Sequence, residues 1–453
     1  MLNTSFFKKS LIFSESKVSD ILKKLDSLFG CVYLENNEAP IVAFLPSEYC
    51  IYQHDQFDFY TRTNLVEFTL NTSNQSLKHF LKRSDCIDSN TKNNFISDFQ
   101  GGYIGFIDYN FSVQAQVSNH FKAQPNLFLG IYKSFLKFED QHWIFYSTEP
   151  EATELYALVN QLVSSEQRPT VFELVTSTQA RWSKDQYQQA FLQVQEYIKA
   201  GDCYQINLTQ EFTAKANGAL LDTAEQFWQL TNAPYSGYLK VNDFELLSCS
   251  PELFINFEQN QKIVTKPIKG TMPRYQDPIL DLQSKNTLAN SQKDQAENVM
   301  IVDLLRNDLS LYAETGSVKT PKLFEIESFN QVHHMISEVT ATLKKEVNPF
   351  DVLLSALPGG SITGAPKIRA MQIIEELEGA PRGAYCGSMG YFNFDGTGSW
   401  NILIRSIQKY QDEVSLWAGG GITIASNCDA EYQECFDKVS AMLDLFNTWH
   451  KPE

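Results

Sequence analysis

Hydrophobic and polar residues alternate along much of the first 160 positions of the chain. The stretches GCVYLENNEAPIVAFL (30–45) and NLFLGIYKSFLKFEDQHWIFYS (126–147) show this most clearly, and QGGYIGFIDYN (100–110) adds an apolar run opened by two glycines. Alternation with a period of two, interrupted by polar turn residues, is typical of β-strands. We therefore predict a strand-rich N-terminal region.

The apolar spacing changes to a helical one beyond about residue 185. Tyr187, Phe191, Val194 and Ile198 recur at intervals of three and four, and Gly201 follows as a stop signal. DQAENVMIVDLLRNDLS (294–310) and DAEYQECFDKVSAMLDLFNTW (429–449) predict further helices. Helices and strands then alternate without a regular βαβ rhythm, which predicts an α+β fold with large antiparallel sheets.

A polar segment separates the two patterns. Residues 164–184, SSEQRPTVFELVTSTQARWSK, contain only one short strand-like piece. We therefore predict an N-terminal region (1–163), a connector (164–184) and a catalytic region (185–449).

Composition and charge narrow the class of protein. The chain has 453 residues, of which 43% are hydrophobic and 20% charged, as in globular proteins with a large core. A net charge of −17 argues against a nucleic-acid binder, and it requires that an anionic substrate meet a locally positive site. There is no apolar run of about 18 residues and no secretory signal. The eight cysteines form no CxxC pair and the histidines no HExxH, which predicts a cytoplasmic protein with reduced thiols.

Lys269 is the first candidate for chemistry. It lies in KPIKGT (266–271), directly after the strand-like QKIVT (261–265). A free lysine has a pKa of about 10.4 and is protonated at neutral pH, so an attacking lysine needs desolvation or cationic neighbours. Lys367, Arg405 and Lys438 would supply such neighbours if they line the same pocket.

Two glycine-rich runs offer backbone amides to an anion. GGSITGAPK (359–367) lacks the Gly-Lys-Ser/Thr ending of a phosphate loop, and GxGxxG does not occur in the chain. AGGGI (418–422) is the second run. Successive glycines allow close approach to an anion, although tight turns explain either run alone equally well.

Glu297 and Glu434 each lie beside the apolar face of a predicted helix. A half-buried carboxylate needs a partner, because an unpaired buried charge is costly. One interpretation is structural, with a salt bridge for Glu297 and an i,i+4 pair between Glu434 and Lys438. The other is that both carboxylates bind Mg²⁺, which prefers oxygen ligands and bridges one or two carboxylates to an anionic substrate.

Eight motifs in fixed order resemble the chorismate-utilising enzyme family, with a dense match from about Tyr187 to Leu445. They are SPELF (250–254), KPIKGT, KDQAENVMIVDLLRNDL (293–309), PGGSITGAPKIRAM (358–371), GAYCGSMGYF (383–392), NILIRS (401–406), AGGGI and AEYQECFDK (430–438). The resemblance implies two antiparallel β-sheets packed as a sandwich with flanking helices. It also implies that residues 1–163 resemble the N-terminal region of anthranilate synthase component I.

The residue before Gly-Thr separates the branches of this family. Anthranilate and isochorismate synthases usually have PIAGT, whereas aminodeoxychorismate synthases usually have PIKGT, as this chain does at Lys269. That branch implies Mg²⁺-dependent amination of chorismate by ammonia to 4-amino-4-deoxychorismate, for 4-aminobenzoate and folate synthesis. Lys269 would attack carbon 2 of the ring before ammonia attacks carbon 4, and Glu252 would be the general acid.

The resemblance also implies the remaining site residues and the partners. Glu297 and Glu434 match magnesium ligands, and the chorismate contacts are Gly270, Thr271, His334, Thr363, Tyr385, Arg405, Gly419, Gly420, Gly421 and Lys438. Pro234, Tyr235 and Ser236 in APYSG match half of a tryptophan pocket, but an LLES-like motif is missing, so feedback by tryptophan is not expected. Ammonia would come from a glutamine amidotransferase on a separate chain, since the sequence contains no GxCxGxQ-like segment.

Two alternatives stay open at this point. The chain could be anthranilate synthase component I, in which case Lys269 is incidental. It could also be a non-catalytic relative that binds tryptophan or chorismate. Glu252, Lys269, Glu297 and Glu434 together favour an enzyme, because a pure binder needs neither a nucleophile nor an acid.

Overall fold

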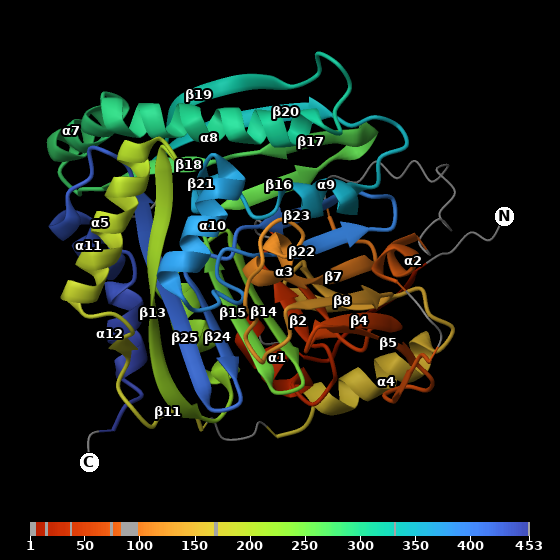
Figure 1. The fold of residues 1–453 in the computed structure, drawn as a ribbon. Coiled ribbons are helices and arrows are strands. Elements are labelled where there is room, and N and C mark those ends of the chain that lie inside the picture. Colours follow the sequence, from red (N-terminus) through yellow and green to blue (C-terminus); the bar gives the residue numbers. More distant parts are fainter. Residues whose placement is uncertain are drawn as a thin grey trace.

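The computed structural model describes residues 6–13, 17–36, 39–72, 76–82, 98–166, 171–329 and 332–451. Two large antiparallel sheets pack against each other, and the helices cover their outer sides (Figure 1). Ile104, Leu239 and Met389 come from both sheets and belong to one buried apolar cluster. The predicted α+β sandwich is confirmed.

The first sheet has 13 strands, and its long strands β13 (Gln205–Asn217) and β25 (Glu413–Ile422) run up the page in Figure 1. Its order is β1 (Phe7–Ser10), β10 (His142–Ser147), β9 (Ser134–Glu139), β3 (Ile41–Ala43), β2 (Val32–Leu34), β14 (Tyr235–Val241), β15 (Phe244–Ser250), β24 (Ser406–Tyr410), β25 (Glu413–Ile422), β13 (Gln205–Asn217) and β11 (Glu173–Leu174). β12 (Gln179–Ala180) and β21 (Gly364–Ala365) also pair with β13.

The second sheet has 12 strands and contains the KPIKGT motif. Its order is β18 (Ile268–Pro273), β20 (Val332–Thr342), β17 (Lys262–Thr265), β16 (Leu253–Phe257), β23 (Gly398–Asn401), β22 (Ser388–Asn393), β7 (Gly102–Ile107), β8 (Leu127–Tyr132), β4 (Glu48–Gln53), β5 (Gln56–Arg62) and β6 (Phe68–Leu70). β19 (Lys319–Ser328) pairs with β20.

The helices follow the amphipathic patterns of the sequence. They are α1 (Val18–Leu25), α2 (Leu77–Lys82), α3 (Tyr109–Val113), α4 (Ala152–Val163), α5 (Lys184–Ala200), α6 (Ala224–Thr231), α7 (Pro278–Ala289), α8 (Gln292–Ser310), α9 (Pro349–Ala356), α10 (Lys367–Glu378), α11 (Cys428–Asp437) and α12 (Ser440–Asn447), with 3₁₀ turns at Leu220–Thr223, Gln259–Gln261 and Gly360–Ile362. In α5 a Ser183–Gln186 capping box satisfies the first amides, and left-handed Gly201 ends the helix as predicted. Within the described parts of the chain, no helix is both long and apolar enough to cross a membrane.

The prediction of one helix over 429–449 was wrong. The chain forms α11 and α12, which are separated at Lys438 and Val439. Val439 leaves the helical conformation at φ −130° and ψ 1°, and its side chain is buried in the apolar cluster beneath the first sheet. The break in the helix thus coincides with the burial of Val439 in the core, which is favourable.

Strands from both sides of the predicted connector build both sheets. β2 pairs with β14 in the first sheet, and β7 pairs with β22 in the second. Two pieces of the connector, β11 and β12, add to β13. The regions 1–163 and 185–449 therefore share one framework, on which the site residues lie.

Candidate functional site

Lys269 projects from a β-bulge. Ile268 pairs with Ile336 and Thr271 with His334, so three steps along β18 match two along β20. The extra residue falls at Lys269 and Gly270, and Gly270 has a φ of +84°. A β-carbon on Gly270 would lie 2.8 Å from Leu288 Cδ1 and 2.9 Å from Asp294 Cγ, and the positive φ by itself favours glycine. Bulges change the direction of a side chain, and this one directs Lys269 out of the regular ladder.

The ammonium of Lys269 contacts Glu297 on α8. Its Nζ lies 3.2 Å from Glu297 Oε2, and the two side chains are 18% and 12% exposed. Glu297 Oε1 is buried without a hydrogen-bond partner, and Lys293 Nζ approaches it only to 3.9 Å. The salt bridge expected for Glu297 therefore exists, but one of its oxygens still lacks a hydrogen bond.

Glu434 lies on α11, where lysine side chains surround its carboxylate. Its Oε1 is 2.6 Å from Lys438 Nζ, which is the expected i,i+4 pair. Burial alone would raise the pKa of Glu434, but the charges of Lys438, Lys269 and Lys293 outweigh burial and lower it. Lys269 is thus within electrostatic reach of Glu434 as well as in contact with Glu297.

Glu252 lies between β15 and β16 and is only 5% exposed. Burial raises its pKa to about 7, although the Ile268 backbone, the charge of Lys269 and the Ser361 hydroxyl oppose the rise. It lines a small space together with Pro267, Gly359 and Ser361, so SPELF, KPIKGT and the glycine run meet here. A carboxyl group with this pKa holds a proton in about half of the molecules near neutral pH.

Thr271 and His334 form a polar pair beside the bulge. Thr271 Oγ1 lies 2.8 Å from His334 Nδ1. Burial, with the nearby charge of Arg405, lowers the pKa of His334 to about 4 despite a hydrogen bond to the Gly270 backbone. His334 is therefore a neutral imidazole at neutral pH. Arg405 keeps its charge, although burial lowers the pKa of its guanidinium.

The AGGGI run of β25 allows other groups to approach its backbone closely. A β-carbon on Gly420 would lie 2.9 Å from Glu431 Oε2 and 3.1 Å from Glu434 Oε1. One on Gly419 would lie 2.2 Å from the Leu208 carbonyl, and Lys438 Nζ donates to the Gly419 carbonyl at 2.7 Å. Glycine is required here because neighbouring groups occupy the space of a side chain.

The remaining residues that were predicted to contact chorismate or tryptophan lie in different environments. Thr363 is fully buried and its hydroxyl donates to the Gly359 carbonyl. Tyr385 is buried and stacks on Trp417, with ring centroids 5.9 Å apart. Pro234, Tyr235 and Ser236 lie at the start of β14 in the first sheet, whereas Lys269 belongs to the second.

Lys367 does not fulfil the role considered for it from the sequence. Its ammonium binds Asp308 at 3.0 Å and the Ala356 carbonyl at 2.8 Å. The group in contact with Lys269 is the carboxylate of Glu297, and the charge of Lys269 helps to lower the pKa values of Glu252 and Glu434 against burial.

Three further residues at the site escaped the sequence analysis. Gln205 on β13 is fully buried with neither amide atom partnered, and its Nε2 would lie 2.5 Å from a β-carbon on Gly421. Glu431 lies against Gly420, and Asp294 lies 2.9 Å from the β-carbon position of Gly270. Glu431 is three residues before Glu434, so the helical period could have indicated it. Nothing in the local sequence marks Gln205.

Comparison with known proteins identifies the family. Residues 32–444 match the family described as chorismate binding enzyme. The chain belongs to this family. Its relatives include aminodeoxychorismate synthase component 1 of Salmonella typhimurium, 43% identical over 352 residues that cover 76% of each chain. The Escherichia coli protein of the same name is 41% identical over 374 residues, covering 82% of this chain and 81% of the relative.

Solved structures of chorismate-binding enzymes share the fold. Anthranilate synthase component I of Streptococcus pneumoniae superposes with a TM-score of 0.75 at 25% identity, covering 89% of this chain and 91% of the other. The menaquinone-specific isochorismate synthase of Escherichia coli reaches 0.72 at 17% identity, covering 97% and 94%. At 17% identity, the second comparison shows that the fold is shared and says nothing about activity.

Proposed function

We propose that this chorismate-binding enzyme aminates chorismate with ammonia to give 4-amino-4-deoxychorismate, the precursor of 4-aminobenzoate in folate synthesis. The observation that carries the proposal is the placement of Lys269 in a bulge, in contact with Glu297 and within electrostatic reach of buried Glu252. Relatives named aminodeoxychorismate synthase component 1 support it over most of the chain.

Two displacements account for the reaction. The unprotonated amine of Lys269 attacks carbon 2 of chorismate, the ring double bonds shift, and the hydroxyl on carbon 4 leaves with the proton of Glu252 as water. Ammonia then attacks carbon 4, the double bonds shift back, and the amine of Lys269 leaves carbon 2. Before it attacks, Lys269 must give up a proton and leave its ion pair with Glu297, because an ammonium has no lone pair.

Glu297 and Glu434 would hold Mg²⁺ in this proposal. The buried and unpartnered Glu297 Oε1 fits a ligand oxygen, and carboxylates are the donors that Mg²⁺ prefers. The ion supplies positive charge to a carboxylate of chorismate when it is bound. Arg405 and Lys438 would add positive charge, and the amides of Gly419, Gly420 and Gly421 would approach the substrate closely. Neutral His334 would orient the Thr271 hydroxyl toward it.

A second polypeptide would supply the ammonia. The relatives are named component 1, which supports a partner component, and we infer that it is a glutamine amidotransferase in the cytoplasm. Tryptophan bound beside Pro234, Tyr235 and Ser236 would be a structural ligand at the start of β14 in the first sheet.

The decisive experiment compares the purified wild type with Lys269→Ala, given chorismate, Mg²⁺ and ammonium salt. We expect 4-amino-4-deoxychorismate from the wild type and a loss of at least about 100-fold in kcat from the variant, resolved by chromatography and mass spectrometry. Lys266→Ala is the matched control, since Lys266 lies in the same motif but is 40% exposed and 3.7 Å from Glu338. Anthranilate from the wild type, or equal rates for both variants, would overturn the proposal.

A further inference from the structure

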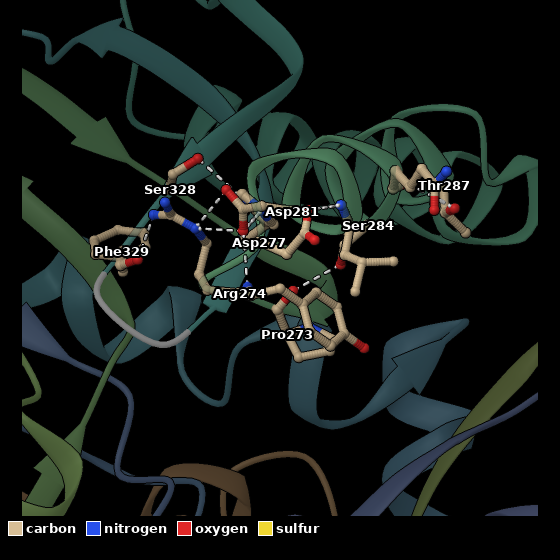
Figure 2. Close-up of polar contacts among 12 residues, drawn as sticks. Pro273, Arg274, Asp277, Asp281, Ser284, Thr287, Ser328 and Phe329 are labelled. Atoms are coloured by element: carbon tan, nitrogen blue, oxygen red, sulfur yellow. Dashed lines mark hydrogen bonds and ion pairs between the residues drawn. The ribbon is translucent and has the colours of Figure 1, made fainter.

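Asp281, in the first turn of α7, is the centre of a polar cluster next to the site. Its Oδ1 accepts hydrogen bonds from Arg274 Nε at 2.8 Å, the Tyr275 amide at 3.0 Å and His333 Nε2 at 3.1 Å. Figure 2 shows Arg274 and Asp281 pointing toward each other between α7 and the end of the β19 strand. The Arg274 hydrogen bond is the chief reason that the pKa of Asp281 falls to about 2, so the carboxylate is ionised throughout the neutral range.

The partners of Asp281 come from two strands of the second sheet. Arg274 directly follows β18, and its Nη1 donates to the Phe329 carbonyl at 2.9 Å, just after β19. His333 belongs to β20, is 1% exposed, and places its Nδ1 2.8 Å from Ser328 Oγ. One carboxylate thus connects the end of β18 with the start of β20.

This connection lies directly beside the bulge. Met272 pairs with His333 and Thr271 with His334. The bulge at Lys269 and Gly270 comes immediately before Thr271 in β18. α7 holds the same strand at further points. The Ser284 hydroxyl donates to the Pro273 carbonyl at 2.7 Å (Figure 2), and Leu288 fills the space beside Gly270.

A shift of register by one position turns every side chain of a strand to the other face, and a bulge makes such a shift within one strand pair. Contacts outside the ladder add to the burial pattern in holding the two strands at this register. On the side of the bulge that leads to α7, the Asp281 cluster supplies charged and buried contacts to both strands.

We propose that Asp281 is a positioning residue: by tying β18 to β20 it fixes the bulge from which Lys269 reaches the site. This inference rests on the proposed function of Lys269. Asp281 does not touch the reacting atoms, and its effect on turnover passes through the direction of the lysine side chain.

The test compares Asp281→Ala with Asp277→Ala. Asp277 caps the same helix, and its carboxylate accepts only from the Ile279 and Leu280 amides among its described contacts, so its loss weakens α7 without releasing either strand. Each protein is assayed for kcat and for melting temperature. Each is also treated with a lysine-acylating reagent, and the labelling of Lys269 is measured by peptide mass spectrometry relative to Lys266.

We expect Asp281→Ala to lower kcat by about 100-fold, because small misplacements of a reacting group have effects of this size. We also expect a several-fold change in Lys269 labelling, in a variant that still melts cooperatively. Equal kcat and equal labelling in the two variants would show that Asp281 stabilises the strands without positioning Lys269, which contradicts the proposal. If Asp281→Ala does not melt cooperatively, Asp281→Leu, which fills similar space without an acceptor oxygen, replaces it, and unchanged labelling there overturns the proposal.

The labelling readout separates this inference from the proposed function. A wild type that forms no 4-amino-4-deoxychorismate refutes the function. The labelling contrast between the two aspartate variants would still report whether Asp281 sets the direction of Lys269.

Discussion

Burial gives Glu252 its chemical character. The side chain is 5% exposed, and its pKa of about 7 lies well above that of an ordinary glutamate. A carboxyl group in such an environment can deliver a proton at neutral pH, which one in water cannot. The same burial carries a cost in stability, because the folded protein must ionise a desolvated carboxyl group when the pH rises.

The role of Glu252 predicts the pH dependence of turnover. A general acid works only when protonated, so kcat should fall as the pH rises through about 7. Glu252→Gln should lower kcat by about 100-fold or more and abolish this alkaline limb. A pH–rate profile between about pH 5.5 and 9 checks both points. An unchanged limb in the variant would assign the titration to another group.

Stability should respond to pH in the same range. The unfolded chain ionises Glu252 near its ordinary pKa, whereas the folded protein keeps the proton up to about 7. The free energy of unfolding of the wild type therefore falls as the pH rises from the pKa of Glu252 in the unfolded chain to its pKa in the folded protein, by up to about 3 kcal/mol. Glu252→Gln removes the loss, so it should melt higher than wild type at alkaline pH and nearly equal to it at acidic pH. Melting curves at both extremes measure this.

Among the elements, the strand pair β18–β20 has the greatest influence on the site. Lys269, Gly270 and Thr271 come from β18 and His334 from β20, so one bulge arranges four of the predicted site residues. The KIVT strand and the helix over 294–310 were predicted from their patterns, and the structure has them as β17 and α8. The bulge was not predicted, since it appears only when the register of β18 against β20 is known.

Gly270 provides a test of the bulge. Gly270→Ala should lower the free energy of unfolding by about 1–3 kcal/mol and abolish most activity, because the added methyl meets Leu288 at a positive φ. Gly316→Ala is the control. Gly316 has a φ of +78° but nothing within 4 Å, so only backbone strain of about 1 kcal/mol is expected. Urea denaturation and turnover of the two variants measure the difference, and equal losses would show that packing around Gly270 is unimportant.

At the scale of the whole molecule, the two regions of the chain are interleaved. Strand pairs such as β2–β14 and β7–β22 cross the predicted boundary in both sheets. Neither region contains a complete sheet, so each would expose unpaired edges and apolar surface if it were separated from the other. The site in the second sheet therefore depends on strands that come early in the chain.

This interleaving predicts the behaviour of a cut chain. A protease site placed at the exposed start of the connector, residues 164–166, should allow cleavage without separation, because many strand pairs hold the parts together. The nicked protein should elute as one species in size-exclusion chromatography and retain turnover. Residues 185–449 expressed alone should show no cooperative melting, and cooperative melting of that fragment would instead establish it as an independent domain.

The sequence by itself determined the local elements and the chemical inventory of this protein. Alternation over 126–147 predicts strands that the structure has as β8, β9 and β10, and the apolar spacing before Gly201 predicts α5. These patterns are readable because each depends on residues a few positions apart. The motifs, in their order, also indicated the family that the comparisons establish.

Only the tertiary structure decided which of these groups meet and in what state. The ion pair of Lys269 with Glu297, the unpartnered amide of Gln205 beside Gly421 and the tie between His333 and Asp281 join distant parts of the chain. Such contacts depend on strand register and on helix packing against the sheets, which no local pattern encodes. The raised pKa of Glu252 likewise follows from burial by surrounding segments, and burial is a property of the folded molecule.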